Sequence, residues 1–293
     1  TVRSMYLANS DIKIGNNNTF KTQLANNSTA AVVAGTTIRS SKGTLGDELS
    51  NTAWVSTGAS ADTIYGVKLD KKSEVTAGTE FVASATNNGS VNNSYGLALA
   101  GNSTLQLGKK ANIRNQQYGD GTDVSTAKER LAAAVDVSGS SVLTVGDHAT
   151  IETDAFDKNI TNIANINIEN SRMTVGKNAK IGAFTSNLNY DANSKLYGVN
   201  VFKTNEQITD TADISIGENS NIVVKGNNMG TIVGLKNSIL GTASLGDHST
   251  ILVAQTSAAI KNADDVTEAN IKQGSGSYIA GYMGLEAGKT TFG

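Results

Sequence analysis

A pattern of nine residues recurs along this chain at intervals of about thirty residues. Its order is apolar, any residue, apolar, Gly, two polar residues, a small residue, any residue and apolar, as in LTVGDHATI at 143–151 and MTVGKNAKI at 173–181. Such a period predicts stacked copies of one small unit that cannot bury a core alone. The repeat glycines of this pattern, weaker copies included, are Gly15, Gly46, Gly78, Gly108, Gly146, Gly176, Gly217, Gly246 and Gly288.

A second recurrent segment lies upstream of the repeat glycine, as in YGVKL at 65–69, YGLAL at 95–99 and YGVNV at 197–201. Apolar and polar residues alternate with period two in both segments, which predicts short strands with one buried face. Each repeat is therefore expected to hold three strands, and equivalent strands of successive repeats are expected to pair about 4.8 Å apart.

These features predict an all-β fold, a three-stranded parallel β-helix (a solenoid) of about nine rungs, formed as one domain over 1–293. The inward residues should form columns along the stack. The expected columns are Val67, Leu97, Val135, Ile166 and Val199 for strand one, Ile14, Leu107, Val145, Val175, Ile216 and Leu245 for strand two, and Ile113, Ile151, Ile181, Ile222 and Ile251 for strand three.

The turns and the insertions have their own signals. The repeat glycine is expected to supply a positive φ between strands two and three, and Asn9, Asn102, Asn170 and Asn237 are expected to form left-handed turns after strand one. Insertions of extra length at about 114–132, 182–196 and 252–278 should project as long loops from one corner of the stack, where solenoids often bind ligands.

Composition excludes several classes of function. The chain has no Cys, which removes disulfides and thiolate sites, and no Pro, which suits strands with neighbours on both sides. Its formal charge of 24 − 26 = −2 gives no argument for nucleic acid or anionic membrane as a partner. We find no apolar run long enough for a spanning helix and no signal-peptide order at the N-terminus, so an exported protein would be represented here by a mature piece or a fragment.

Segments such as YGLALAGNSTLQLGKKANI and AAVDVSGSSVLTVGDHATI resemble the passenger-domain repeats of monomeric (type V) autotransporter adhesins of the pertactin and AIDA-like group. The resemblance extends from about Tyr6 to Leu285. It implies a right-handed β-helix, export across the outer membrane of a Gram-negative bacterium to the cell surface, and a role in adhesion.

Catalytic interpretations of the sequence are weaker. Both histidines, His148 and His248, fall in Gly-Asp-His turns three rungs apart, about 14 Å from each other, which is too far to share a metal ion. The outward rows of the predicted strands show no neighbouring carboxylates of the kind that a glycosidase needs. We therefore expect no enzymatic activity, no cofactor and no metal, with a polysaccharide lyase or hydrolase as the alternative.

Two surfaces are candidate binding sites for an adhesin. A flat polar column on strand two could bind a second copy through many weak hydrogen bonds, which would support cell–cell association and biofilm formation. Its residues are Thr76, Gln106, Thr144, Thr174, Ser215 and Ser244. A groove beside the insertions could instead bind a host glycan, such as a glycosaminoglycan, or a matrix protein. Its residues are Lys128, Arg130, Asp136, Asn167 and Asn200. Neither surface implies nucleic-acid binding or membrane insertion.

Overall fold

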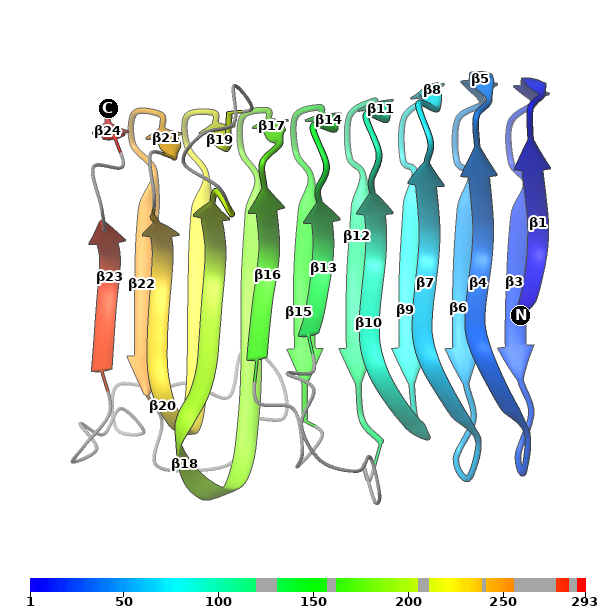
Figure 1. The fold of residues 1–293 in the computed structure, drawn as a ribbon. Coiled ribbons are helices and arrows are strands. Elements are labelled where there is room, and N and C mark those ends of the chain that lie inside the picture. The colour runs from blue at the N-terminus through cyan, green and yellow to red at the C-terminus, as the bar shows by residue number, and fades with distance from the viewer. Residues whose placement is uncertain (120–130, 157–161, 205–210, 239–240, 256–277, 285–288) are drawn as a thin grey trace.

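The computed structural model describes residues 1–119, 131–156, 162–204, 211–238, 241–255, 278–284 and 289–293. Within these ranges every regular element is a β-strand, and every strand pair is parallel (Figure 1). The strands form two sheets, of fifteen and nine strands. No helix in the described ranges has the length and apolar character needed to span a bilayer.

Sheet B, the nine-stranded sheet, consists of four-residue strands that directly precede the repeat glycines. Its strands are β2 Asp11–Ile14, β5 Lys42–Leu45, β8 Glu74–Ala77, β11 Thr104–Leu107, β14 Val142–Val145, β17 Arg172–Val175, β19 Asp213–Ile216, β21 Thr242–Leu245 and β24 Lys289–Phe292.

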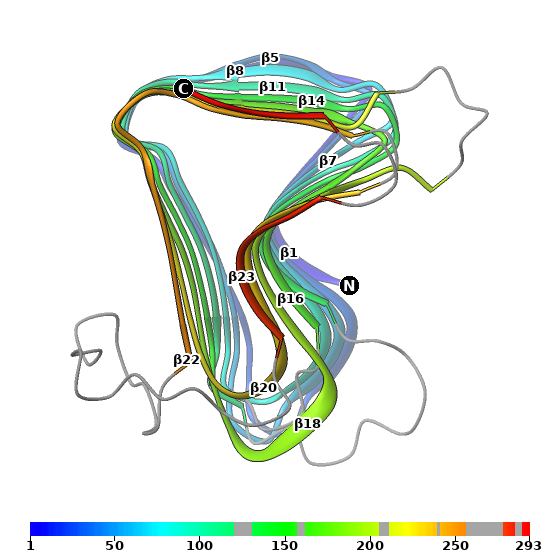
Figure 2. The same cartoon turned by 90° about the vertical axis from the view of Figure 1, so that its left-hand side faces the viewer.

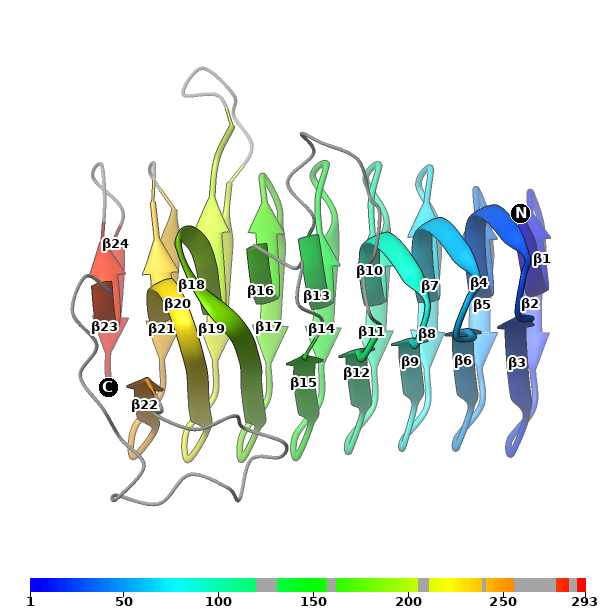
Figure 3. The same ribbon diagram turned by 90° about the horizontal axis from the view of Figure 1, so that it is seen from below.

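Sheet A, the fifteen-stranded sheet, has two arms (Figure 3). The first arm contains β1 Val2–Ala8, β4 Thr29–Arg39, β7 Ser60–Asp70, β10 Ser90–Leu99, β13 Leu131–Val137, β16 Asn162–Glu169 and β23 Tyr278–Gly284. The second arm contains β3 Thr19–Leu24, β6 Ser50–Val55, β9 Val82–Asn87, β12 Asn112–Gln117, β15 Thr150–Ala155 and β22 Thr250–Gln255. Two longer strands, β18 Lys180–Phe202 and β20 Asn221–Asn237, run through both arms and join them.

The predicted stacking of equivalent residues is confirmed by the register of the strands. In sheet B, Val145 pairs with Val175, and Val175 pairs with Ile216. In the first arm Val67, Leu97 and Val135 are successive partners, and the second arm aligns its Ile column in the same way. A shift by one residue would turn every apolar side chain outward, so the alternating pattern fixes this register.

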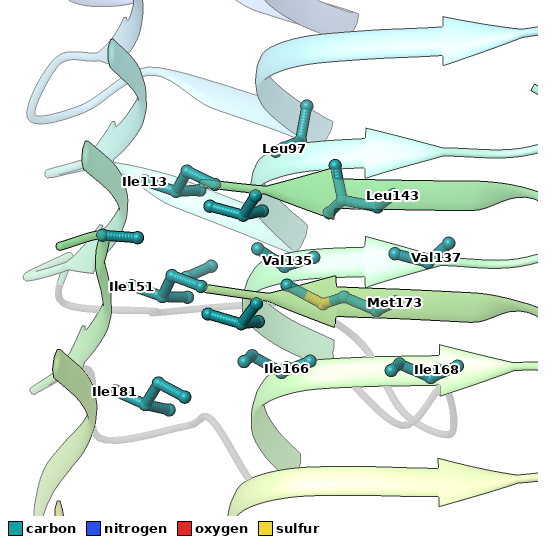
Figure 4. Close-up of a cluster of buried hydrophobic side chains, with 14 of the residues drawn as sticks. Leu97, Ile113, Val135, Val137, Leu143, Ile151, Ile166, Ile168, Met173 and Ile181 are labelled. Atoms are coloured by element: carbon teal, nitrogen blue, oxygen red, sulfur yellow. The ribbon is translucent and has the colours of Figure 1, made fainter. Parts of the chain in front are cut away.

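The columns meet inside the stack and form its main core (Figure 4). Leu97, Val135 and Ile166 come from the first arm, and Ile113 and Ile151 come from the second arm; all five are fully buried. Sheet B adds Leu143 and Met173 from the third side. Because each strand contributes only a few inward side chains, this core exists only through the stacking of successive repeats.

The role predicted for the repeat glycines was wrong. Gly46, Gly108 and Gly146 are not among the residues with positive φ. A Cβ on Gly146 would lie 2.7 Å from the carbonyl oxygen of Gly108, so the glycine is needed for the close approach of stacked turns. The positive φ falls two residues later in the turn, at Asn17, Glu48, Glu80, Lys110, His148, Asn178, Asn219 and His248.

Two further predictions about turns and repeats need correction. The left-handed turns after strand one are confirmed at Asn9, Asn102 and Asn170, whereas Asn237 is the last residue of strand β20. The ninth repeat glycine is Gly293 and not Gly288, because Leu245 pairs with Phe292 and so aligns Gly246 with Gly293. Gly288 lies outside the described residues.

The first arm bends part-way along its length (Figure 2), and a glycine stands second in its YGV-like segment. A Cβ on Gly66 would lie 2.5 Å from the amide nitrogen of Ser84 on the second arm and 2.5 Å from the carbonyl oxygen of Gly96. Because glycine has no Cβ, the backbones of the two arms can approach each other closely at this position. The outer face of the first arm is concave at this bend.

The prediction of a loop at 182–196 needs correction, because these residues lie inside strand β18 and form no separate corner loop. The other two insertions are described only at their edges. Residues 114–117 belong to β12 and 252–255 to β22, while 120–130 and 256–277 lie outside the described residues.

Candidate functional site

The polar column predicted on strand two lies on the outer face of sheet B. Thr76 pairs with Gln106, Gln106 with Thr144, and the same register continues to Ser244. Thr76, Gln106, Thr174 and Ser215 are exposed, and Thr144 and Ser244 are half-buried. The structure therefore brings all six predicted residues into one row of hydroxyl and amide groups without formal charge.

A second outward column runs beside this row and carries the charges of the face. Lys42 pairs with Glu74 at 2.9 Å and Arg172 pairs with Asp213 at 3.4 Å, each between adjacent rungs. Val142, which is 37% exposed, interrupts the charges in the middle of the sheet. Exposed ion pairs of this kind contribute little to stability, but they leave a face that can accept and donate many hydrogen bonds.

Three of the predicted groove residues form a hydrogen-bonded ladder on the outer face of the first arm. The Asn200 amide donates to Asn167 Oδ1 over 2.9 Å, and the Asn167 amide donates to Asp136 Oδ1 over 2.8 Å. Both asparagines are buried, at 9% and 6% exposure, although sequence placed them as accessible groups beside loops. Their burial arises because neighbouring rungs stack at strand spacing and cover them.

The ladder ends in one charged group and one open acceptor. Burial raises the pKa of Asp136 from 3.8 to about 6, against the hydrogen bond from Asn167, which lowers it, and with the help of the charge on Glu169. At the other end, buried Asn200 Oδ1 has no hydrogen-bond partner among the described residues. The next residue in the column is Lys236, whose pKa is lowered by burial and then by Lys195.

Aromatic rings extend this face toward the N-terminal rungs. Tyr65 and Tyr95 stack with ring centroids 5.3 Å apart, and Lys68 Nζ lies 5.0 Å from the centroid of the Tyr65 ring. Burial, followed by the charge of Asp136, raises the pKa of Tyr65 to about 12 and raises that of Tyr95 as well. Both phenols are therefore neutral hydrogen-bonding groups at physiological pH.

The other two predicted groove residues, Lys128 and Arg130, lie outside the described residues. Their position relative to Asp136, Asn167 and Asn200 therefore stays a prediction. The loops expected to border the groove also stay a prediction, apart from the segment at 182–196, which is a strand.

The outward rows were predicted to hold no neighbouring carboxylates, and the structure corrects this prediction. Glu152 and Asp154 both point outward from β15 and share a hydrogen bond; burial, followed by the Glu152 carboxyl, raises the pKa of Asp154. Arg114 is beside Glu152 in the register, and Gln116 is beside Asp154. The signal was the alternation of ATIETDA, which continues four residues beyond the recurrent pattern and keeps both acids on one face.

The two histidines occupy equivalent left-handed turn positions, with φ of 59° at His148 and 56° at His248, and both are exposed. Among the described residues no group of three His, Asp or Glu side chains is placed to hold a metal ion. In comparisons with known proteins, no family model, no curated protein and no solved structure matches the chain.

Proposed function

We propose that this chain is a right-handed, three-stranded parallel β-helix of about nine rungs that serves as a non-enzymatic adhesin at a bacterial cell surface, where copies on opposing cells associate. The outer face of sheet B supports the proposal. It is a continuous nine-stranded surface in which a row of hydroxyl and amide groups runs without formal charge from Thr44 to Thr291, with Lys13 at its N-terminal end. A resemblance of the repeats to autotransporter passenger domains points the same way.

The energetics favour association that is weak for one pair of molecules and strong for many. Each intermolecular hydrogen bond contributes about 0.5–1.5 kcal/mol, and the nine strands extend over about 40 Å. A second copy laid along this row could form several such bonds, and many pairs between two cells would act together.

Replacement of Thr144, Thr174 and Ser215 by Lys tests the proposal. Three like charges on the face should abolish aggregation of cells or beads that display the chain, and should remove the dimer in sedimentation velocity. Lysines at Thr19, Thr52 and Ser84, on the outer face of the second arm, add the same charge elsewhere and should leave aggregation unchanged. Equal loss in both triple variants, or none in either, would contradict the proposal.

A second candidate function is binding of a host glycan or matrix protein by the outer face of the first arm. The unpartnered, buried Asn200 Oδ1 beside a ladder of amides favours it, since such an acceptor is costly unless a donor reaches it. An array of glycosaminoglycans, other glycans and matrix proteins should show a ligand whose binding weakens in Asn200→Ala and is unchanged in Asn221→Ala, an exposed residue of the second arm.

The non-enzymatic part of the proposal has its own test, because Glu152 and Asp154 are neighbouring carboxyl groups on one face of β15. Incubation with a panel of polysaccharides should release neither reducing ends nor unsaturated sugars. Release that disappears in Glu152→Gln would replace the adhesin with the polysaccharide-active alternative.

A further inference from the structure

A pocket lies on the outer face of the first arm at its N-terminal end. It is formed by three adjacent strands, β1, β4 and β7, which lie side by side (Figure 3). Its lining is made of basic, aromatic and hydroxyl side chains, with one carboxylate. The residues are Thr1, Arg3, Tyr6, Val32, Thr37, Arg39, Lys68 and Asp70.

Positive charge exceeds negative charge in this pocket. Arg39 Nε is 3.5 Å from Asp70 Oδ1, and Lys68 Nζ is 3.9 Å from Asp70 Oδ2, so two cations share one carboxylate. The third cation, Arg3, lies over the Tyr6 ring at 3.9 Å and forms no ion pair with any described residue. With these four groups the side-chain charge is 3 − 1 = +2, in a chain whose formal charge is −2.

The pocket differs from the paired charges found elsewhere on the surface. Lys110 lies opposite Glu80 at 2.9 Å and Lys177 lies opposite Glu218 at 2.7 Å, one cation to one carboxylate, whereas two cations share Asp70 in the pocket. Here Asp70 Oδ1 is buried and accepts no hydrogen bond of good geometry. An anion that entered between the two arginines would meet planar donor groups suited to an oxyanion.

We propose that this pocket binds the anionic substituent, a carboxylate or a sulfate, of an acidic polysaccharide whose chain continues along the outer face of the first arm. The inference rests on the proposed surface function and names the chemistry of a ligand. The strand register places the Tyr65–Tyr95 stack and then the Asp136–Asn167–Asn200 ladder farther along the same face. The tyrosine rings and the two asparagine amides of this face are neutral and suit sugar rings and hydroxyls.

The charges along the face also limit the kind of polymer. Asp136 and Glu169 stand on the same arm beyond the pocket, so a chain with a charge on every residue, such as a nucleic acid, would be repelled there. A heteropolysaccharide that alternates acidic and neutral sugars can place one acidic residue in the pocket and its neutral neighbours beyond it.

The test measures Kd for keratan sulfate oligosaccharides, in which neutral sugars separate the sulfated ones, for hyaluronan oligosaccharides, which carry a carboxylate on every second sugar, and for neutral dextran. Arg3→Gln and Arg39→Gln should each weaken binding of at least one acidic probe about tenfold, as expected for loss of one charge-assisted contact. Lys21→Gln, which removes an exposed charge from the second arm, should change Kd less than twofold. Binding of hyaluronan assigns the pocket to carboxylate, and binding of keratan sulfate alone assigns it to sulfate.

A fourth variant makes the opposite prediction. Asp70→Asn removes the carboxylate that competes with the ligand for Arg39 and Lys68, so the acidic probe should bind several-fold tighter, whereas general damage to the fold would weaken it. Circular dichroism and the unfolding midpoint verify that each variant is folded.

The inference is overturned if no acidic probe binds, if Lys21→Gln weakens binding as much as the arginine variants, or if Asp70→Asn weakens it. Aggregation of displayed chains is measured on the same variants. If the wild type binds no acidic probe while the sheet B lysines still abolish aggregation, only this inference fails, and if aggregation survives the sheet B lysines, the proposed function fails.

Discussion

At the scale of single residues, the atoms of the neighbouring rung determine which residue type fits a position and how its side chain titrates. Gly146 illustrates this, because its φ is ordinary and the need for glycine comes from the backbone of Gly108 in the preceding rung. Asp136 is a second example, since the rungs on either side bury its carboxyl and raise its pKa. Both effects are invisible to rules that consider one turn or one strand at a time.

Gly146→Ala should destabilise the protein by about 2 kcal/mol or more, because the new Cβ would lie 2.7 Å from Gly108 backbone atoms that cannot move aside. The matched control is Gly15→Ala, at the equivalent turn position, where a Cβ meets nothing within 4 Å. It should be neutral or slightly stabilising. Urea unfolding of the two variants decides the matter, and equal destabilisation would restore a conformational role for the repeat glycine.

Asp136→Asn should change the pH dependence of stability. A pKa raised from 3.8 to about 6 means that the folded protein binds the proton more tightly, so the wild type loses stability as the pH rises from about 4 to about 6. That loss amounts to about 3 kcal/mol, and Asn, which has no charge to desolvate, should escape it. The variant should exceed the wild type in free energy of unfolding at pH 7 but not at pH 4, and the same difference at both values would refute the explanation.

At the scale of elements, the turn before sheet B is held by a ladder of buried serines. The backbone N–H of Ser73 donates to Ser103 Oγ, and that of Ser103 donates to Ser141 Oγ. The hydroxyls of Ser73 and Ser103 also donate to a carbonyl of their own turn, as Ser103 Oγ does to Ala100 over 2.7 Å. The ladder fixes successive turns against one another while strand hydrogen bonds fix the sheets.

Ser103→Ala should cost about 1–3 kcal/mol, because the N–H of Ser73 and the carbonyl of Ala100 lose a partner in a buried site. Thr104→Ala, one residue later and exposed on sheet B, should stay within about 0.5 kcal/mol of the wild type. The comparison requires only thermal or urea unfolding. A neutral Ser103→Ala would show that water replaces the ladder.

The sequence predicted the columns of strands correctly because the alternation of Val145 and Val175 with polar neighbours leaves one register. It failed where the outcome depends on contact between rungs or on length variation. The 182–196 segment continues as strand β18 since it can pair with β16 and β20, which no local signal reveals. The candidate face of sheet B was found from the same alternation, whereas the basic pocket needs residues from three rungs and has no linear motif.

At the scale of the whole molecule, successive repeats present equivalent surfaces to one another. Val145 occupies in its rung the place that Val175 occupies in the next, and Leu143 corresponds to Met173. Each strand therefore has a partner of the same shape one repeat away. A rung removed in register would leave matching surfaces to close the gap, as expected for quasi-one-dimensional stacks.

Deletion of residues 147–176, one complete repeat, should leave a protein that retains its β-sheet circular dichroism and unfolds cooperatively, because β14 can then pair with β19 as β17 does now. Deletion of 162–176, half a repeat, joins unlike strands and should abolish the cooperative transition. If both deletions unfold the chain equally, its rungs are not interchangeable.

The pairing of each strand with its equivalent in the adjacent repeat also sets how far along the chain any contact reaches. Leu97 meets Val67 from thirty residues earlier and Val135 from thirty-eight residues later, and the same short reach holds along the stack. A segment that has already folded thus offers a finished template to the next few dozen residues, and nothing distant is required. Such a chain can fold progressively from one end. If the chain passes through a narrow opening, the folding of each new repeat onto the previous one would pull it forward.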